Sequence, residues 1–372
     1  MRGTIVITGG GTGGHIFPMQ AVGEALRARG VAPSALRYVG SRRGQEASLL
    51  GSGPVPLTLL PGRGLRRSLT PEAWLANAGA VIGLSAAVLI ALVKIGRWWP
   101  SVVVSVGGYA SFATTFAAWV WRRPLVLVEL DAVAGAAHRS FTHYAAKRCT
   151  AFASDEPRTI VTGVPLRESL VGLERSSESR RAACAMMDPP IDPSRDVVVV
   201  MTGSLGSARV NGAVTEMAAM WHDRLDRAIV HVSGRRDYAE VMARTPELHG
   251  LDYRVVEFGD MTVLWRLCDV AVCRSGATTV AELTALGIAS VLVPLPGAPG
   301  DHQTKNAQML LERGAALVLA DVDCSASALA PLVEQILEPR HRSRMQASAK
   351  SLGHRDAATS IAQVILDVRG DV

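Results

Sequence analysis

A glycine-rich run near the start of the chain has the composition of a phosphate-binding loop. Residues 9–14 read Gly-Gly-Gly-Thr-Gly-Gly, and His15 follows them directly. Because glycine has no side chain, such a backbone can approach a phosphate closely, with the amides of a helix N-terminus facing the negative charge. Gly9, Gly11 and Gly14 also satisfy the G-x-G-x-x-G pattern, which is not specific on its own. His15 is either a helix cap or a functional residue at the floor of a cleft.

Two other kinds of phosphate site, those for dinucleotides and for nucleoside triphosphates, also use a glycine loop between a strand and a helix. A dinucleotide site carries an acidic residue after its second strand, whereas here that predicted strand ends in Gly-Ser-Arg-Arg at residues 40–43. The arginines could hold a 2′-phosphate, so an NADP-dependent oxidoreductase stays open as an alternative. No Gly-Lys-Ser/Thr follows the glycine loop, which excludes the P-loop of a nucleoside triphosphatase.

A second run of small residues, in the C-terminal half, also joins a predicted strand to a predicted helix. It occupies residues 274–282, which start with an arginine and end with a glutamate. The small residues would present helix N-terminal amides to a diphosphate, and Arg274 would add positive charge. Glu282 is placed to accept two hydrogen bonds from a ribose, although a first-turn acid also complements the helix dipole. The polar residues 301–307 could bind sugar hydroxyls, so the half resembles a nucleotide-sugar site.

The sequence predicts neither a metal nor another cofactor. It lacks an Asp-x-Asp motif, and the helix termini would take the place of a cation. The five cysteines are widely spread without a Cys-x-x-Cys pair, which argues against a disulfide framework or a zinc ribbon and favours reduced, cytosolic thiols. The N-terminus begins directly with a strand, so we expect no signal peptide.

The elements that position these loops are strands and helices in alternation. The chain has 372 residues, enough for two domains, and its 48% hydrophobic and 5% aromatic content suits aliphatic parallel strands. Strands are predicted at residues 4–8, 36–39, 102–106 and 125–128, and again at 197–201, 229–232, 270–273 and 290–294. Residues 174–195, rich in Ser, Arg, Asp and Pro, are interpreted as part helix and part connection between the domains. The predicted fold class is α/β, with two doubly wound Rossmann-like domains facing a cleft.

Charge and hydropathy indicate a membrane surface and no nucleic acid. The net charge of +6 is scattered, without the basic stripe interleaved with aromatics that single-strand binders use. Residues 73–93 contain no charged side chain and are long enough to span a bilayer. A buried helix and a true span remain alternatives, but the flanks favour an interfacial helix. These flanks comprise Arg63, Arg66 and Arg67 on one side and Lys94, Arg97, Trp98 and Trp99 on the other.

Taken together, the motifs resemble the MurG family, the UDP-N-acetylglucosamine:lipid I N-acetylglucosaminyltransferases. The similarity spans nearly the whole chain, with the motifs in family order. They are Gly10-Gly11-Thr12-Gly13-Gly14-His15 with Pro18, Gly107-Gly108-Tyr109, Thr162-Gly163-Val164-Pro165-Leu166-Arg167, Gly203-Ser204 with Gly206, residues 274–282 and residues 301–307. The resemblance implies a GT-B fold and an inverting, metal-free transfer of N-acetylglucosamine from UDP-GlcNAc to lipid I, the undecaprenyl-diphosphate-linked muramyl-pentapeptide.

The resemblance also implies roles for individual residues. For an inverting transfer the first candidate for the general base is His15, with Glu129 and Asp131 as alternatives, and His15 could instead hold the acceptor diphosphate. The acceptor diphosphate and the transferred sugar would lie at Thr12, Gly13 and Gly14, with Asp131 accepting hydrogen bonds from a sugar. The donor would be bound by Arg167, Ser204, Gly259 (at uracil), Arg274, Ala277, Thr278, Thr279, Val280, Ala281, Glu282 and Gln303 (at the sugar).

The implied domains are residues 1–168 for the acceptor and the membrane, 169–355 for UDP-GlcNAc, and 356–372 as a helix packing back on the first domain. The implied location is the cytoplasmic face of the cell membrane, in peripheral contact with an anionic surface. Another GT-B transferase with a secondary-metabolite acceptor, and a UDP-sugar sensor without turnover, are the competing hypotheses.

The sequence departs from the family pattern at the end of one strand. The family's His-Glu-Gln-Asn is replaced by Val128-Glu129-Leu130-Asp131, and Leu205 stands where the second glycine loop usually has Gln. Asp131 can accept a hydrogen bond from a sugar but cannot donate one as an amide does. The departure bears on sugar and acceptor specificity, and leaves the predicted fold and nucleotide site intact.

Overall fold

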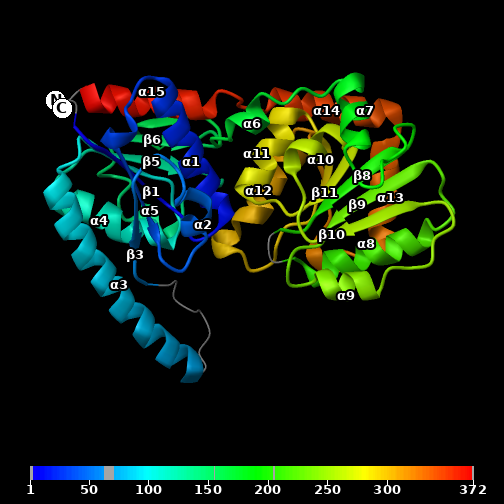
Figure 1. The fold of residues 1–372 in the computed structure, drawn as a ribbon, viewed down its shortest axis with the longest axis horizontal. Coiled ribbons are helices and arrows are strands. Elements are labelled where there is room, and N and C mark those ends of the chain that lie inside the picture. Colours follow the sequence, from blue (N-terminus) through cyan, green and yellow to red (C-terminus); the bar gives the residue numbers. More distant parts are fainter. Residues whose placement is uncertain (1–2, 63–70, 155, 204–205, 371–372) are drawn as a thin grey trace. The chain divides into compact units, whose positions relative to one another are not determined.

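The protein consists of two compact α/β units, shown in the computed structural model of Figure 1. The first unit combines residues 1–167 with 355–372, and the second comprises residues 168–354. The structure describes residues 3–62, 71–154, 156–203 and 206–370, with side chains from residue 79 onward in the helix that starts at Pro71. Each unit contains one sheet, and every strand pair in both sheets is parallel.

The first unit is built on a seven-stranded sheet of order β3-β2-β1-β4-β5-β6-β7. Its strands are β1 (Ile5–Thr8), β2 (Leu36–Ser41), β3 (Leu57–Leu60), β4 (Val102–Ser105), β5 (Leu125–Glu129), β6 (Lys147–Thr150) and β7 (Thr159–Val161). β1, β4 and β5 are buried along their whole length, which explains their runs of Val, Ile and Leu. The strand order reverses between β1 and β4, where the loops after both strands leave a crevice in folds of this class.

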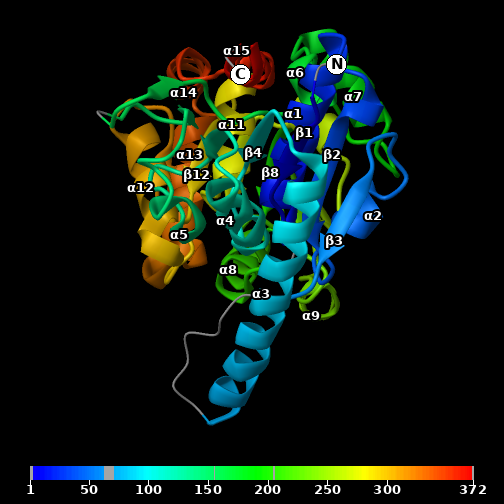
Figure 2. The ribbon, with the colours of Figure 1, turned by 90° about the vertical axis from the view of Figure 1, so that its left-hand side faces the viewer.

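Helices cover both faces of this sheet. They are α1 (Gly13–Ala28), α2 (Glu46–Leu50), α3 (Pro71–Trp98), α4 (Phe112–Val120), α5 (Ala136–Arg139) and α15 (Ala357–Gly370). The C-terminal α15 contacts α1, β4 and β6, so the end of the chain is part of the first unit. α3 packs on α4 at its C-terminal end and projects beyond the rest of its unit (Figures 1 and 2).

The second unit has a six-stranded sheet of order β10-β9-β8-β11-β12-β13. The strands are β8 (Asp196–Met201), β9 (Arg227–Val232), β10 (Asp252–Val256), β11 (Val270–Cys273), β12 (Ala289–Leu292) and β13 (Leu317–Val318). The helices are α6 (Glu168–Val171), α7 (Ser177–Ala185), α8 (Ala208–Met220), α9 (Tyr238–Ala243), α10 (Met261–Leu267), α11 (Ala277–Leu286), α12 (His302–Leu311), α13 (Ala326–Leu337) and α14 (Pro339–Ser351). Its core lies between this sheet and helices α8, α13 and α14.

The predicted α/β class with two doubly wound domains is confirmed, and all eight predicted strands are present within a residue or two of their predicted ends. Five further strands, β3, β6, β7, β10 and β13, were not predicted. The helix predicted within residues 174–195 is present as α7, but the interpretation of the rest as the connection between domains is wrong. Arg180 forms a 2.7 Å ion pair with Asp269, and Arg175 donates to the backbone carbonyl of Trp265, so this stretch packs within the second unit.

Candidate active site

In the first unit, the glycine loop connects β1 to the start of α1. Thr12 is the N-cap of α1, so the N-terminal amides of this helix lie at Gly13 and Gly14. Gly10 and Gly11 have φ angles of +119° and +101°, which side-chain-bearing residues rarely adopt. The loop therefore requires glycine at these positions, and it ends at a helix terminus whose polarity favours an anion.

His15 occupies the first turn of α1 and faces the loop that follows β4. A Cβ atom added to Gly107 would lie 3.5 Å from the His15 ring, and one added to Gly108 would lie 2.4 Å from the carbonyl oxygen of Gly10. The two loops at the switch point of the sheet are thus in direct contact, with the half-buried imidazole between them. This places His15 where folds of this class bind their ligands.

His138 is a residue of this site that the sequence analysis did not identify. It lies on α5, is buried, and its Nε2 is 2.8 Å from the hydroxyl of Ser105 at the end of β4. Burial, together with smaller contributions from the positive charges of His15 and Arg148, lowers the pKa of His138 to about 3. His138 therefore stays neutral at physiological pH, and its nearness to His15 couples the electrostatics of the two rings.

Glu129 is held in a buried ion pair. Its two carboxylate oxygens accept from Nε and Nη2 of Arg148 at 3.1 and 3.0 Å, and its side chain is only 6% exposed. A carboxylate engaged in this bidentate way is poorly available to accept a proton from a substrate. Asp131, two residues further on, is half-buried in the loop after β5.

Arg167, predicted to contact the donor phosphates, lies over an aromatic ring of α1. Its guanidinium carbon is 4.2 Å from the centre of the Phe17 ring. The same ring lies close to the backbone of Gly13, since a Cβ atom added there would be 3.1 Å from it. The structure therefore brings Arg167 to the start of α1, together with Thr12, Gly13 and Gly14.

In the second unit, the run from Arg274 to Glu282 forms the turn from β11 into α11. Gly276 is the N-cap of α11, and Ala277, Thr278 and Thr279 form its half-buried first turn. The first-turn amides of a helix have no intrahelical acceptors and suit a phosphate. Val280 is buried and Ala281 half-buried behind them. Ser204, also predicted for this site, lies outside the described residues.

The side chain of Arg274 is held by groups of its own unit. It donates to the carbonyl oxygens of Val293 and Pro294, both at 3.0 Å, and forms an ion pair with Asp321 at 2.6 Å. The pair with Asp321 offsets much of its positive charge. In this structure Arg274 joins the ends of β11 and β12, so it shapes the edge of the site and contributes less free positive charge there than the sequence predicts.

Glu282, Gln303 and Gly259 are all positioned by contacts within the second unit. The buried carboxylate of Glu282 accepts a hydrogen bond of 2.8 Å from the indole Nε1 of Trp265, which fixes its orientation. The Oε1 atom of Gln303 accepts from the backbone amide of Leu295 at 3.0 Å. Gly259 packs against Leu264, whose Cδ1 would be 2.4 Å from an added Cβ, so a side chain at this position would force Leu264 to shift.

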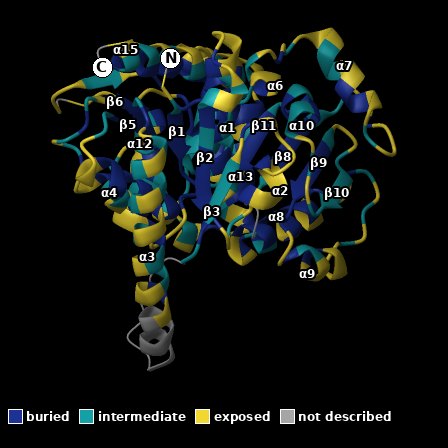
Figure 3. Ribbon diagram, turned by 60° about the vertical axis from the view of Figure 1, so that its left-hand side comes forward, coloured by how far each residue is buried: buried dark blue, intermediate teal, exposed yellow. Residues whose placement is uncertain are grey.

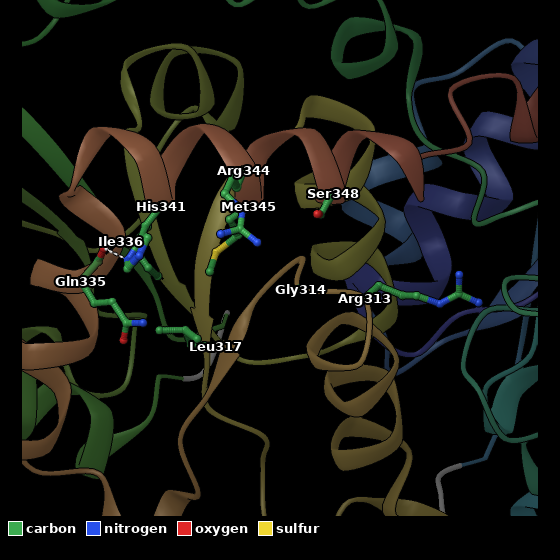
Figure 4. A pocket seen from close by; sticks show the side chains of 9 residues that line it. All are labelled: Arg313, Gly314, Leu317, Gln335, Ile336, His341, Arg344, Met345 and Ser348. Carbon is green, nitrogen blue, oxygen red and sulfur yellow. Dashed lines mark hydrogen bonds between the residues drawn. The ribbon is translucent and has the colours of Figure 1, made fainter.

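A separate hollow of about 260 Å³ lies in the second unit between α13, α14 and β13 (Figure 4). None of the predicted site residues lines it, and the side chain of Arg313 extends away from it in Figure 4. It is lined by Arg313, Gly314, Leu317, Gln335, Ile336, His341, Arg344, Met345 and Ser348. Within the described part of the chain, no group of three or more His, Cys, Asp or Glu residues is placed to hold a metal ion.

Comparison with known proteins defines the class of the molecule. Residues 5–150 match the glycosyltransferase family 28 N-terminal domain, and residues 197–362 match the family's C-terminal domain. The solved structure of MurG from Acinetobacter baumannii is similar with a TM-score of 0.74 over 98% of this chain and 99% of that one, at 24% identity. The chain is a glycosyltransferase with the GT-B fold.

Curated relatives identify the family within this class. A protein of Alkalilimnicola ehrlichii is 35% identical over 98% of both chains, and one of Syntrophotalea carbinolica is 35% identical over 98% of this chain and 99% of its own. Both are named UDP-N-acetylglucosamine–N-acetylmuramyl-(pentapeptide) pyrophosphoryl-undecaprenol N-acetylglucosamine transferase. This chain belongs to that family, the MurG family, as its motifs predicted.

Proposed function

We propose that this protein transfers N-acetylglucosamine from UDP-GlcNAc to the 4-hydroxyl of the muramyl sugar of lipid I, with inversion, to give lipid II for peptidoglycan. Full-length similarity to relatives named for this reaction supports the proposal. The observation that carries it is the pair of helix starts, α1 beside His15 in one unit and α11 in the other. Each follows a buried parallel strand and has the polarity to bind a phosphate.

His15 is the general base of the proposed mechanism. Inversion requires the acceptor hydroxyl to attack the anomeric carbon from the side opposite to UDP, and a base removes its proton as the bond forms. An imidazole ordinarily titrates at about pH 6.5, which suits this task. Glu129 is the weaker candidate because Arg148 occupies both of its carboxylate oxygens. We assign Glu129 to positioning the end of β5, and Asp131 to hydrogen bonding with a sugar hydroxyl.

The second unit binds the donor in this proposal. The start of α11 binds the diphosphate, and its helix-end polarity stabilises the negative charge that UDP gains on leaving. Glu282 accepts from the ribose hydroxyls, the backbone of Gly259 meets the uracil, and Gln303 meets the sugar. Arg167 is assigned to the phosphates from the first unit. These groups act without a metal or another cofactor.

The proposed location is the cytoplasmic face of the membrane, in peripheral contact with anionic lipid through α3. Within α3, Gly79–Trp98 is apolar and long enough to cross a bilayer, but only 22% of its apolar stretch is buried in the protein. Figure 3 shows exposed positions along the projecting part of α3. Three apolar side chains of this helix are largely exposed: Ile82 by 72%, Leu89 by 64% and Val93 by 69%. At its C-terminal end, Lys94 lies 5.6 Å from the Trp98 ring and Arg123 lies 4.7 Å from the Trp99 ring.

An interfacial position fits this helix better than a span. β3 and β4 precede and follow α3 within one sheet, so both ends of the segment belong to the same folded unit. A span would also carry the link between β3 and α3, with Arg63, Arg66 and Arg67, across the hydrocarbon, where charges and unpaired backbone are costly. The structure of these arginines lies outside the described residues.

The transfer reaction is tested by measuring UDP release from UDP-GlcNAc with and without a lipid-diphosphate muramyl-pentapeptide acceptor. We expect release that depends on the acceptor, with a β-linked disaccharide as product. Equal release with a soluble secondary-metabolite acceptor would contradict the proposal, and so would UDP binding without turnover.

Membrane contact is tested by sedimentation with vesicles that contain anionic phospholipid. The double variant Ile82→Gln/Leu89→Gln removes two exposed apolar side chains from α3, and we expect it to lose most vesicle binding while soluble UDP binding is unchanged. Leu225→Gln is the matched control, since Leu225 is 70% exposed in the second unit. Equal vesicle binding by all three proteins would rule out α3 as the docking element.

A further inference from the structure

Glu46 is a fully buried carboxylate directly beneath the first glycine loop. It is the first residue of α2, and its side chain has 0% exposure. Its Oε1 atom accepts two backbone hydrogen bonds, from Gly11 at 2.9 Å and from Ser41 at 2.8 Å. One oxygen therefore joins the loop that follows β1 to the end of the neighbouring strand β2.

Three glycines make room for this carboxylate. A Cβ atom added to Gly10 would lie 2.1 Å from Oε1 of Glu46, and one added to Gly44 would lie 1.9 Å from Oε2. At Gly40 the added atom would lie 2.7 Å from Cγ. A side chain at any of these positions would force Glu46 to move, so the three glycines leave the space that its carboxyl group occupies.

Tyr109 closes the loop from the opposite side. Its ring lies against Gly11, since an added Cβ would be 2.8 Å from Cε1, and its hydroxyl is 2.7 Å from the hydroxyl of Ser41. Gly11 is thus held between the carboxylate of Glu46 and the ring of Tyr109. Ser41 contributes to both contacts, through its backbone amide and its hydroxyl.

The carboxyl group of Glu46 is held by the loop itself. Among the described residues no cation forms an ion pair with it, and its Oε2 atom has no hydrogen-bond partner. Its donors are the backbone amides of Gly11 and Ser41. Since the amide of Gly11 is already used, an acceptor phosphate would be left with the amides that follow, at the start of α1.

We propose that Glu46 is a positioning residue for sugar transfer, which fixes Gly11 and thereby the start of α1 that carries His15. Only three residues lie between Gly11 and His15 along the chain, and the first turn of α1 begins among them. A shift of the loop would move the imidazole relative to the acceptor hydroxyl. This inference rests on the proposed transfer function.

The test compares Glu46→Asp, Glu46→Gln and wild-type protein. The aspartate variant keeps the charge but is one methylene too short to reach Gly11 and Ser41, so we expect kcat/KM for the lipid acceptor to fall about 100-fold, as for a catalytic group displaced by about 1 Å. The glutamine variant keeps a carbonyl oxygen in place and should stay near the wild-type value. Glu24→Gln is the matched control, since Glu24 lies on α1 and bonds only to Gln20 at 2.8 Å among the contacts of its side chain that the structure describes.

Two further readouts separate positioning from general loss of structure. UDP affinity should be unchanged in all variants, and faster amide hydrogen exchange in the aspartate variant should be confined to peptides covering residues 9–16 and 41–46. Wild-type turnover by the aspartate variant would overturn the proposal. So would equal losses in both Glu46 variants, or a parallel loss of UDP affinity. If wild-type protein shows no transfer, the proposed function fails, and the exchange data alone decide whether Glu46 anchors the loop.

Discussion

The two units hold their glycine loops in similar places but with different electrostatics. In each sheet a glycine loop follows the first strand of the unit, β1 or β8, and an acidic side chain from beyond the next strand lies beneath it. Glu46 follows β2, and Asp237 follows β9. A Cβ atom added to Gly206 would lie 2.6 Å from Oδ2 of Asp237, much as one added to Gly10 would meet Glu46.

The partners of the two acids differ. Glu46 accepts from loop amides, and no cation pairs with it in the described parts of the chain. Asp237 pairs with Arg236 at 2.7 Å and accepts from the side-chain amide of Asn211 at 3.0 Å. Asn211 is held in turn by the buried His231 at 2.9 Å. Among the described residues, the first acid is therefore bound by backbone amides alone, whereas the second is paired with a cation.

This difference suggests a division of labour. A loop fixed from beneath by backbone hydrogen bonds to one carboxyl group suits the precise placement of the acceptor and a base. A loop whose acid is paired with a cation, and which lies next to the start of α11, suits the diphosphate of UDP. In this account the first unit performs the chemistry and the second binds UDP, and the predictions below test that separation.

His15→Ala should distinguish the contributions of the two units to turnover and UDP binding most strongly. Removal of the proposed base should lower kcat by about 1,000-fold, within the range for general-base catalysis, while UDP affinity stays unchanged. Steady-state transfer kinetics and calorimetric titration with UDP measure the two effects. Comparable losses in both quantities would assign His15 to binding and break the comparison.

Glu282→Ala should have the opposite pattern. We expect UDP affinity to weaken about tenfold, or about 1.4 kcal/mol, with a small effect on kcat at saturating donor. Because Glu282 also accepts from Trp265, the variant Trp265→Phe is the control: it removes the indole donor and leaves the carboxylate. If the tryptophan variant loses as much UDP affinity, the role of Glu282 is to support the fold and not to bind ribose.

Each unit also contains one buried neutral histidine, which predicts a smaller, pH-dependent effect. Burial lowers the pKa of His138 to about 3 and that of His231 to about 4. Above about pH 6.5 neither the folded nor the unfolded state is protonated at these rings, whereas below it only the unfolded state gains the proton. As the pH falls from about 6.5 toward these lowered pKa values, the free energy of unfolding should therefore decrease by up to about 1.4 kcal/mol per pH unit for each histidine.

Urea unfolding at pH 7 and pH 5.5 measures this slope. His138→Asn should reduce the dependence of unfolding free energy on pH in the first unit alone. His222→Asn is the control in the second unit, since His222 is exposed. An unchanged slope in the His138 variant would show that this ring is already protonated in the folded protein.

Local patterns in the sequence predicted eight of the strands, both glycine loops and the family, because each depends on residues close together in the sequence. The anchors of these loops could not be predicted in the same way. Glu46 is 35 residues from Gly11, and the two meet only because β2 aligns in parallel beside β1. A single glutamate in a polar loop gives no sign that it will be buried beneath a backbone amide.

Contacts between residues far apart in the sequence also explain why the surroundings of Glu129 and Arg274 differ from those predicted. Glu129 and Arg274 were selected for their position at strand ends, where their charges suit a base and a diphosphate. Their ion-pair partners, Arg148 and Asp321, come from later elements that the fold brings alongside. His138 was missed because its burial and its contact with Ser105 depend on how α5 packs against β4.

The most direct test of the division of labour uses Gly10→Ala and Gly206→Ala, with single-turnover transfer and UDP affinity measured on the same samples. Each added methyl group would collide with the acid beneath its own loop, at 2.1 Å from Glu46 or 2.6 Å from Asp237. We predict that Gly10→Ala loses transfer and retains UDP affinity, whereas Gly206→Ala loses UDP affinity. If the two variants lose both properties to the same extent, the separation between the units is contradicted.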